Sequence, residues 1–95
     1  MKPLERIFFQ ACIMRVLLSD THRVTVWDIV NIFSVLGFSR KRLWYYIRKW
    51  DRLGFYDYGV TEALGWFDPD KFIGEYKVMY EKILKERENG TMRNR

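Results

Sequence analysis

Apolar residues recur along this chain at helical spacing in four segments, and three of these segments lie before residue 54. Residues 4–18 are apolar around most of their circumference, which predicts a helix that is covered on nearly all sides. Residues 26–36 carry one apolar stripe, formed by Ile29, Val30, Phe33 and Leu36. Residues 39–53 carry another, formed by Leu43, Tyr46, Ile47, Trp50 and Leu53. Spacings of three and four residues place each stripe on one inward-facing side of a helix.

The residues at the ends of these segments predict where the second and third helices begin and end. Thr25 precedes the second helix and Asp28 follows three residues later, which predicts a variant of the capping box. Ser39 is expected to cap the third helix. Gly37 is expected to end the second helix, and Gly54 is expected to end the third in the left-handed conformation. Because the link between these two helices is so short, we expect them to cross.

The rest of the chain predicts a β-hairpin and a fourth helix. Aromatic residues on both sides of a glycine-containing turn indicate two short strands within residues 55–67. Asp68, Pro69 and Asp70 then supply a cap, a proline at the first helical position and acidic charge at the positive end of a helix. The inward stripe of this fourth helix is formed by Phe72, Ile73, Tyr76, Met79, Tyr80 and Ile83. The predicted fold class is therefore mainly α with a small β-hairpin (α+β).

The composition excludes several classes of protein. The 95 residues are 48% hydrophobic and 18% aromatic, which is too apolar for a disordered tail and predicts one soluble domain over residues 1–88 with a frayed basic tail over 89–95. The longest apolar stretch is interrupted by Gln10 and Arg15 and is shorter than the roughly 20 residues of a membrane span. With no secretory signal evident, we expect an intracellular protein that does not enter a membrane. The single cysteine, Cys12, excludes an internal disulfide and is expected to be a buried apolar residue.

The positive charge of the chain is concentrated in the third helix. The whole sequence has a net charge of +5, but residues 39–54 alone carry six cations and one anion, or +5, and residues 55–70 carry four anions and no cation, or −4. The face opposite the apolar stripe contains Lys41, Tyr45, Arg48 and Arg52. A run of charge is often only a solvated face, but cations interleaved with aromatic residues on one helical face favour nucleic-acid binding.

The order helix, helix, turn, basic helix and hairpin resembles the winged helix-turn-helix family from about residue 4 to residue 84. The closest local resemblance lies at the end of the third helix, where Ile47 and Trp50 stand seven and four residues before Gly54. In that family, apolar residues at this point precede a glycine–apolar pair that leads into the first strand of the wing. Trp50 departs from the family pattern, which usually has Leu, and implies an enlarged local core.

The resemblance implies that the third helix, residues 39–53, is a recognition helix that enters the major groove of double-stranded DNA. The residues expected to contact bases are Arg40, Lys41, Trp44, Tyr45 and Arg48. The residues expected to contact phosphates are Thr25, Ser39, Arg42, Lys49 and Arg52. A second departure concerns the wing, which contains Glu62 and no Lys or Arg between Tyr58 and Leu64. We therefore expect this wing to make no strong contact with the DNA backbone.

The resemblance also implies a homodimer, because winged-helix regulators often dimerise through their terminal helices. Helices 4–18 and 69–87 supply more apolar surface than a small core can cover, which favours the same interpretation. The two basic helices of such a dimer would enter successive major grooves, about 34 Å apart. A compact regulator of this kind, with no evident domain for a small-molecule ligand, suits a virus, a plasmid or another mobile element.

Two other interpretations of the basic helix remain open. The chain could be a winged-helix module that binds a protein in a larger assembly, through exposed aromatic residues such as Trp27 and Trp44. Trp27 lies on the polar side of the second helix, where it either covers the edge of the core or contacts a partner. The chain could also be an accessory protein of replication or partition that binds DNA without regulating transcription.

An enzyme is not expected, because nothing in the sequence indicates catalytic chemistry or a cofactor. His22 is the only histidine, lacks a second histidine or cysteine to complete a metal site, and is expected to be a surface residue. The acidic residues near the hairpin are explained by capping and solubility. No glycine-rich phosphate loop is present in the sequence. We therefore expect no catalytic residue, no metal and no cofactor.

Overall fold

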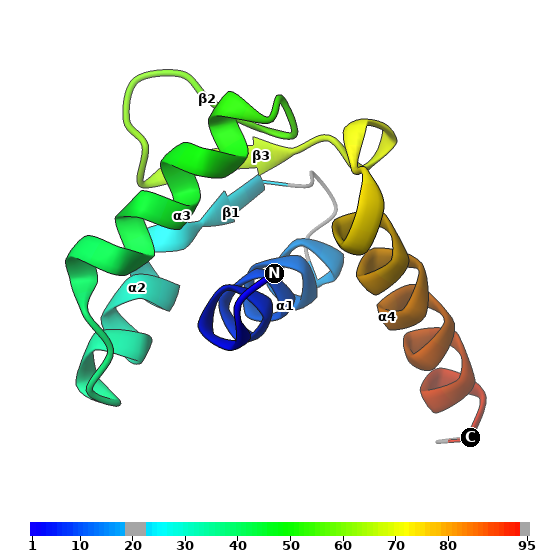
Figure 1. The fold of residues 1–95 in the computed structure, drawn as a ribbon. Helices are drawn as coiled ribbons and strands as arrows, with labels where there is room; N and C mark the ends of the chain where they lie inside the picture. Colours follow the sequence, from blue (N-terminus) through cyan, green and yellow to red (C-terminus); the bar gives the residue numbers. More distant parts are fainter. Residues whose placement is uncertain (19–22, 94–95) are drawn as a thin grey trace.

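The computed structural model describes residues 1–18 and 23–93, which form four α-helices, a small sheet and one 3₁₀ turn (Figure 1). The helices are α1 (Pro3–Leu17), α2 (Val26–Val35), α3 (Arg40–Arg52) and α4 (Gly74–Arg93). The strands are β1 (Arg23–Thr25), β2 (Tyr56–Tyr58) and β3 (Leu64–Phe67), and the 3₁₀ turn is Pro69–Lys71. The predicted class, mainly α with a small antiparallel sheet, is confirmed.

The sheet contains a strand that the sequence pattern did not predict. Its order is β1-β3-β2, with both neighbours antiparallel to the central β3. Thr25 belongs to β1 and pairs with Leu64. It also stands at the N-cap of α2, but its side chain makes no capping hydrogen bond, so the predicted capping box is wrong. The backbone of Thr25 continues a strand instead of adopting the geometry that would direct its hydroxyl at the helix end.

The predicted boundaries between α2 and α3 are confirmed. Gly37 and Gly54 follow the two helices with φ angles of +100° and +91°, which residues with a side chain rarely adopt. The hydroxyl oxygen of Ser39 accepts a hydrogen bond from the backbone N–H of Arg42 at 3.3 Å. Gly37 ends α2 and Ser39 caps the start of α3 only two residues later. This short turn fixes the orientation of α3 relative to α2.

The core lies where α1, α2, α3 and the sheet meet, and it is rich in aromatic rings. Trp50 is fully buried, with its ring centroid 5.4 Å from that of Phe8 and 5.2 Å from that of Phe9. Trp50 therefore packs against α1 from its position on α3. Three predicted core residues, Leu36, Leu53 and Ile73, are instead 67%, 40% and 56% exposed. Leu36 and Leu53 stand at the C-cap of their helix, where the chain turns away before the stripe can be covered. Ile73 lies before the start of α4, in the link that follows the 3₁₀ turn.

Helix α1 is covered on one face only, which corrects the expectation of a helix buried on nearly all sides. Phe8, Phe9 and Ile13 are fully buried, whereas Ile7 and Met14 on the opposite side are 50% and 51% exposed. None of the helices in residues 1–18 and 23–93 is both long and apolar enough to cross a bilayer.

The fourth helix begins later than predicted. Pro69 starts a separate 3₁₀ turn, in which the Asp68 carboxylate accepts a hydrogen bond from the N–H of Asp70 at 3.2 Å. The chain is extended at Phe72, and α4 starts at Gly74. It continues to Arg93, so the first five residues of the expected tail, 89–93, are helical, while residues 94–95 lie outside the described part.

The hairpin is held by one close approach between its strands. A side chain at Gly65 would collide with the ring of Tyr56 and the backbone oxygen of Asp57. The absence of that side chain lets the Tyr56 hydroxyl reach across and donate a hydrogen bond to the backbone oxygen of Glu62 at 2.7 Å. This contact positions the turn of the hairpin beside α3.

Candidate nucleic-acid interface

The exposed face of α3 brings together three of the six cations that the sequence singled out. Leu43, Tyr46, Ile47 and Trp50 are buried against the core. Lys41, Tyr45, Arg48 and Arg52 follow one another at spacings of four, three and four residues, and all four are exposed. The guanidinium of Arg52 lies 5.8 Å from the centroid of the Tyr45 ring. The predicted separation of an apolar face from a basic face is therefore present.

Two of the predicted base-contacting residues, Arg40 and Trp44, lie on the side of α3 that faces α2. Arg40 donates a hydrogen bond to the side-chain oxygen of Asn31, and its guanidinium lies 5.6 Å from the centroid of the Trp27 ring. The rings of Trp27 and Trp44 are 6.2 Å apart, and Trp27 is 48% exposed. Arg40 is thus held against an aromatic pair, not extended beside Lys41.

Arg48 is paired with the acidic residue of the hairpin. Its Nε lies 3.1 Å from Oε2 of Glu62. More than half of the Arg48 side chain and nearly a third of the Glu62 side chain are exposed. A polyanion that approaches α3 can therefore replace Glu62 at modest cost, because exposed ion pairs contribute little free energy.

The residues expected to contact phosphates are divided among three places. Ser39, Arg42 and Lys49 lie on the side of α3 that faces α1, and Arg52 lies on the exposed face described above. Thr25 stands at the N-terminal end of α2, whereas Ser39 follows its C-terminal end.

The structure also shows a buried acidic residue in α1 that the sequence pattern did not single out as a site residue. Glu5 is 1% exposed, and its two carboxylate oxygens are shared among three side chains. Oε1 accepts a hydrogen bond from Nζ of Lys49 at 3.0 Å, and Oε2 accepts one from Nε1 of Trp50 at 3.0 Å. The hydroxyl of Tyr76 also donates to Oε2. This carboxylate therefore joins α1, α3 and α4.

The environment of Glu5 stabilises its charged form. Burial by itself raises the pKa of a carboxyl group, but the hydrogen bonds from Tyr76, Trp50 and Lys49 outweigh burial, so the pKa of Glu5 lies below its ordinary value. Burial would lower the pKa of Lys49, but its contact with Glu5 raises that pKa above the ordinary value. A signal for this site was present in the sequence, since Glu5 lies three, four and seven residues before Phe8, Phe9 and Cys12 on the same helical face.

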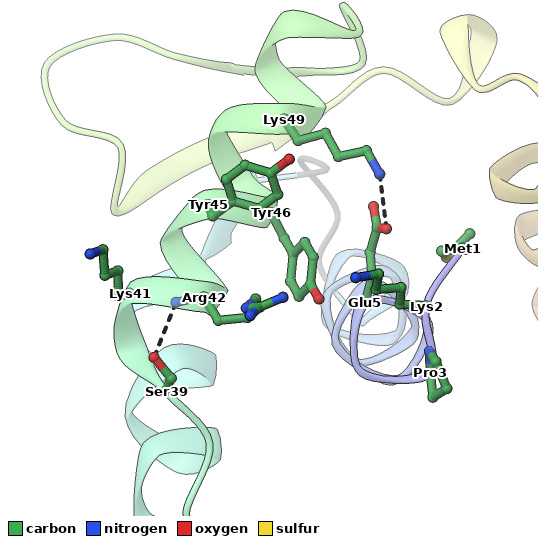
Figure 2. Close-up of a pocket in the computed structure, with 10 residues that line it drawn as sticks. All are labelled: Met1, Lys2, Pro3, Glu5, Ser39, Lys41, Arg42, Tyr45, Tyr46 and Lys49. Carbon is green, nitrogen blue, oxygen red and sulfur yellow. Dashed lines mark hydrogen bonds and ion pairs between the residues drawn. The ribbon is translucent and has the colours of Figure 1, made fainter.

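An open groove lies between the start of α1 and the side of α3 that carries Arg42 and Lys49 (Figure 2). Its volume is about 920 Å³. In Figure 2, Arg42 and Lys49 extend from α3 towards the beginning of α1. The groove is lined by Met1, Lys2, Pro3, Glu5, Ser39, Lys41, Arg42, Tyr45, Tyr46 and Lys49.

The described residues contain no group of three or more His, Cys, Asp or Glu side chains able to hold a metal ion. Cys12 is fully buried, as expected, and burial raises the pKa of its thiol. The surface position expected for His22 lies outside the described residues.

Comparison with protein-family models, with curated proteins and with solved structures finds no match to this chain. A function must therefore be argued from the geometry and the charge of α3 and its two neighbouring surfaces.

Proposed function

We propose that this chain is a winged helix-turn-helix protein that binds double-stranded DNA, with α3 in the major groove. The observation that carries the proposal is the exposed face of α3, where Lys41, Arg48 and Arg52 flank the half-exposed ring of Tyr45. An α-helix fits the width of the major groove, and Arg and Lys are the side chains that most often contact guanine there. Tyr45 offers an aromatic surface for thymine methyl groups or sugars.

The neighbouring elements support this orientation of α3. A short turn with Gly37 and Ser39 holds α3 against α2, and the hairpin β2–β3 follows directly after Gly54. This order corresponds to helix, helix, recognition helix, wing and additional C-terminal helix. The only acidic side chain of the wing turn, Glu62, contacts Arg48, so the wing modulates the recognition helix and is not expected to hold a phosphate by itself.

The proposal extends to a homodimer that regulates transcription, as expected for a compact regulator of a virus or another mobile element. Apolar side chains remain exposed on both terminal helices, at Ile7 and Met14 of α1 and at Val78 of α4. A second copy that covered them would present two α3 helices to two successive major grooves. Sedimentation at micromolar concentration should then give twice the chain mass, and a stable monomer would remove this part of the proposal.

The test of DNA binding is a salt series with random-sequence duplex, measured by fluorescence anisotropy. Replacing Lys41 and Arg52 by Gln should weaken binding at low salt about tenfold and reduce the slope of log K against log salt by at least about 0.9, the value for the lost phosphate contact of Arg52. The matched control replaces Lys77 and Lys85 of α4, which removes the same charge elsewhere on the surface. Equal effects of the two double variants would show that binding depends on net charge and not on α3.

A second candidate, a protein-interaction module, is favoured by half-exposed Trp27, which lies beside partly buried Trp44 and the guanidinium of Arg40. Partly exposed Trp and Arg side chains are the residues that most often dominate the energy of protein interfaces. In that case the wild-type chain should fail to bind duplex DNA even at low salt. Replacing Trp27 by Ser should then abolish binding to the protein partner and leave the fold intact.

A further inference from the structure

We propose that the groove between the start of α1 and α3 holds the sugar–phosphate backbone of one DNA strand, with Lys2 and Arg42 as its phosphate-binding residues. This inference rests on the proposed DNA binding by α3 and adds a contact surface from a second helix. Lys2 lies outside the basic helix and is not among the residues expected to contact DNA. In the folded chain, Lys2 and Arg42 line the same groove.

The charge of the groove favours an anion. Lys2, Lys41 and Arg42 line it and are exposed, and within residues 1–18 and 23–93 their side chains make no ion pair or side-chain hydrogen bond. The negative charge of Glu5 is matched by Lys49 at 3.0 Å. The groove therefore carries three cations whose charge is not compensated, and a ligand that approaches it meets a positive potential.

The position of the groove favours a DNA strand over a small free anion. Lys41 and Tyr45 belong both to the groove and to the exposed face of α3, so the two surfaces are continuous. A helix in the major groove is flanked by the phosphate backbones, and phosphate contacts fix the orientation of a protein on the duplex. One strand can thus pass along the groove while Tyr45 and Arg48 contact bases.

Glu5 has a specific effect in this arrangement. Lys49 lines the groove, but its ammonium group is paired with the Glu5 carboxylate (Figure 2). The DNA strand would therefore meet an ion pair with no net charge at this position. Replacing Glu5 by Gln removes one negative charge and keeps an oxygen that can accept the hydrogen bonds of Trp50 and Tyr76. Lys49 then becomes available to a phosphate, and DNA binding should become tighter.

The experiment compares three variants of the full chain in the same anisotropy titration with random duplex. Lys2→Gln should lower the slope of log K against log salt by about 0.9 and weaken binding several-fold at low salt. Glu5→Gln should steepen the slope by up to about 0.9. Lys77→Gln is the matched control, because it removes an exposed lysine from α4, and thermal unfolding by circular dichroism verifies that each variant is folded. The Lys2 side chain makes no capping hydrogen bond, so its loss should leave α1 intact.

The outcomes separate this inference from the proposal on which it rests. If Lys2→Gln behaves as Lys77→Gln does while the Lys41 and Arg52 double variant still loses affinity, the groove holds no strand and DNA binding by α3 stands. If folded Glu5→Gln binds DNA no more tightly than wild type, Lys49 does not face a phosphate and the assigned course of the strand is wrong. If the wild-type chain does not bind duplex at low salt, both proposals fail. Competition by poly-glutamate or inorganic phosphate as strong as that by duplex would identify a general anion site and overturn the assignment to DNA.

Discussion

Within residues 1–18 and 23–93, two ion pairs connect α3 to other elements, and they are nearly identical in length but different in surroundings. Lys49 lies 3.0 Å from Glu5 of α1, and Arg48 lies 3.1 Å from Glu62 of the hairpin turn. The Glu5 side chain is 2% exposed, whereas that of Glu62 is 31% exposed. Of these two adjacent cations, Lys49 is therefore paired with a buried carboxylate and Arg48 with a partly exposed one.

The difference indicates which cation belongs to the fold and which is available to a ligand. Removing one partner of a buried pair leaves an uncompensated charge and unsatisfied hydrogen-bonding groups, which is costly. Removing one partner of an exposed pair costs little, because water takes its place. We infer that Lys49 fixes α3 against α1, while Arg48 exchanges Glu62 for a phosphate or a base when DNA is bound.

The largest expected effect is that of Glu5→Ala on the free energy of unfolding. The substitution removes the acceptor for Trp50 and Tyr76 and leaves Lys49 unpaired, so it should lower the free energy of unfolding by about 3 kcal/mol. Urea titration measures this change. Lys49→Met in the Glu5→Ala background should cost less than Lys49→Met alone, since the two residues are coupled.

The matched control for that measurement is Glu81→Ala on α4. Glu81 is exposed, and within the described residues its side chain makes no ion pair or hydrogen bond. Its replacement should change the free energy of unfolding by less than about 0.5 kcal/mol. A loss at Glu5 no larger than this would show that the buried pair does not stabilise the fold, and the contrast with Glu62 would disappear.

The same contrast shows why only part of the molecule was predictable from the sequence. Periodicity is a local property, so it placed α2, α3 and the shared face of Lys41, Tyr45 and Arg48 correctly. Strand β1 was missed because Thr25 and its neighbours pair with β3, about forty residues further along the chain. The prediction that Leu36 and Leu53 are buried was wrong, because periodicity does not indicate at which residue the packing of a helix against the core ends.

The partners of the site residues were less predictable than their positions. Arg40 is held by Asn31 and lies against the ring of Trp27, and Lys49 is held by Glu5. Each of these contacts requires the relative placement of two helices, which no local pattern contains. The burial of Glu5 was predictable even though its partners were not. It lies on the same helical face as Phe8 and Cys12, and a carboxylate buried on such a face needs hydrogen-bond or charge partners.

A second and smaller effect concerns pH. Because the pKa of Glu5 is lower in the folded chain than its ordinary value of 4.5, the unfolded chain takes up the proton first as the pH falls. The contribution of Glu5 to stability is therefore complete above about pH 4.5 and is lost as the pH falls through the lower, folded-state pKa. The advantage of wild type over Glu5→Gln in urea unfolding should shrink progressively over the acidic range below about pH 4.5. An advantage that stays constant over this range would mean that the folded-state pKa is not lowered.

The smallest expected effect is that of Glu62→Gln, which tests the exposed ion pair between Glu62 and Arg48. The change should alter the free energy of unfolding by less than about 0.5 kcal/mol, because the pair with Arg48 is solvated. It should nevertheless tighten binding to random duplex two- to threefold, about 0.5 kcal/mol, since Arg48 no longer has to leave a carboxylate before it contacts DNA. The gain should vanish when Arg48→Gln is also present, which assigns it to this pair. A gain that persists without Arg48 would mean that Glu62 acts on the DNA only through its own charge, and Arg48 would lose its role as the cation that exchanges partners.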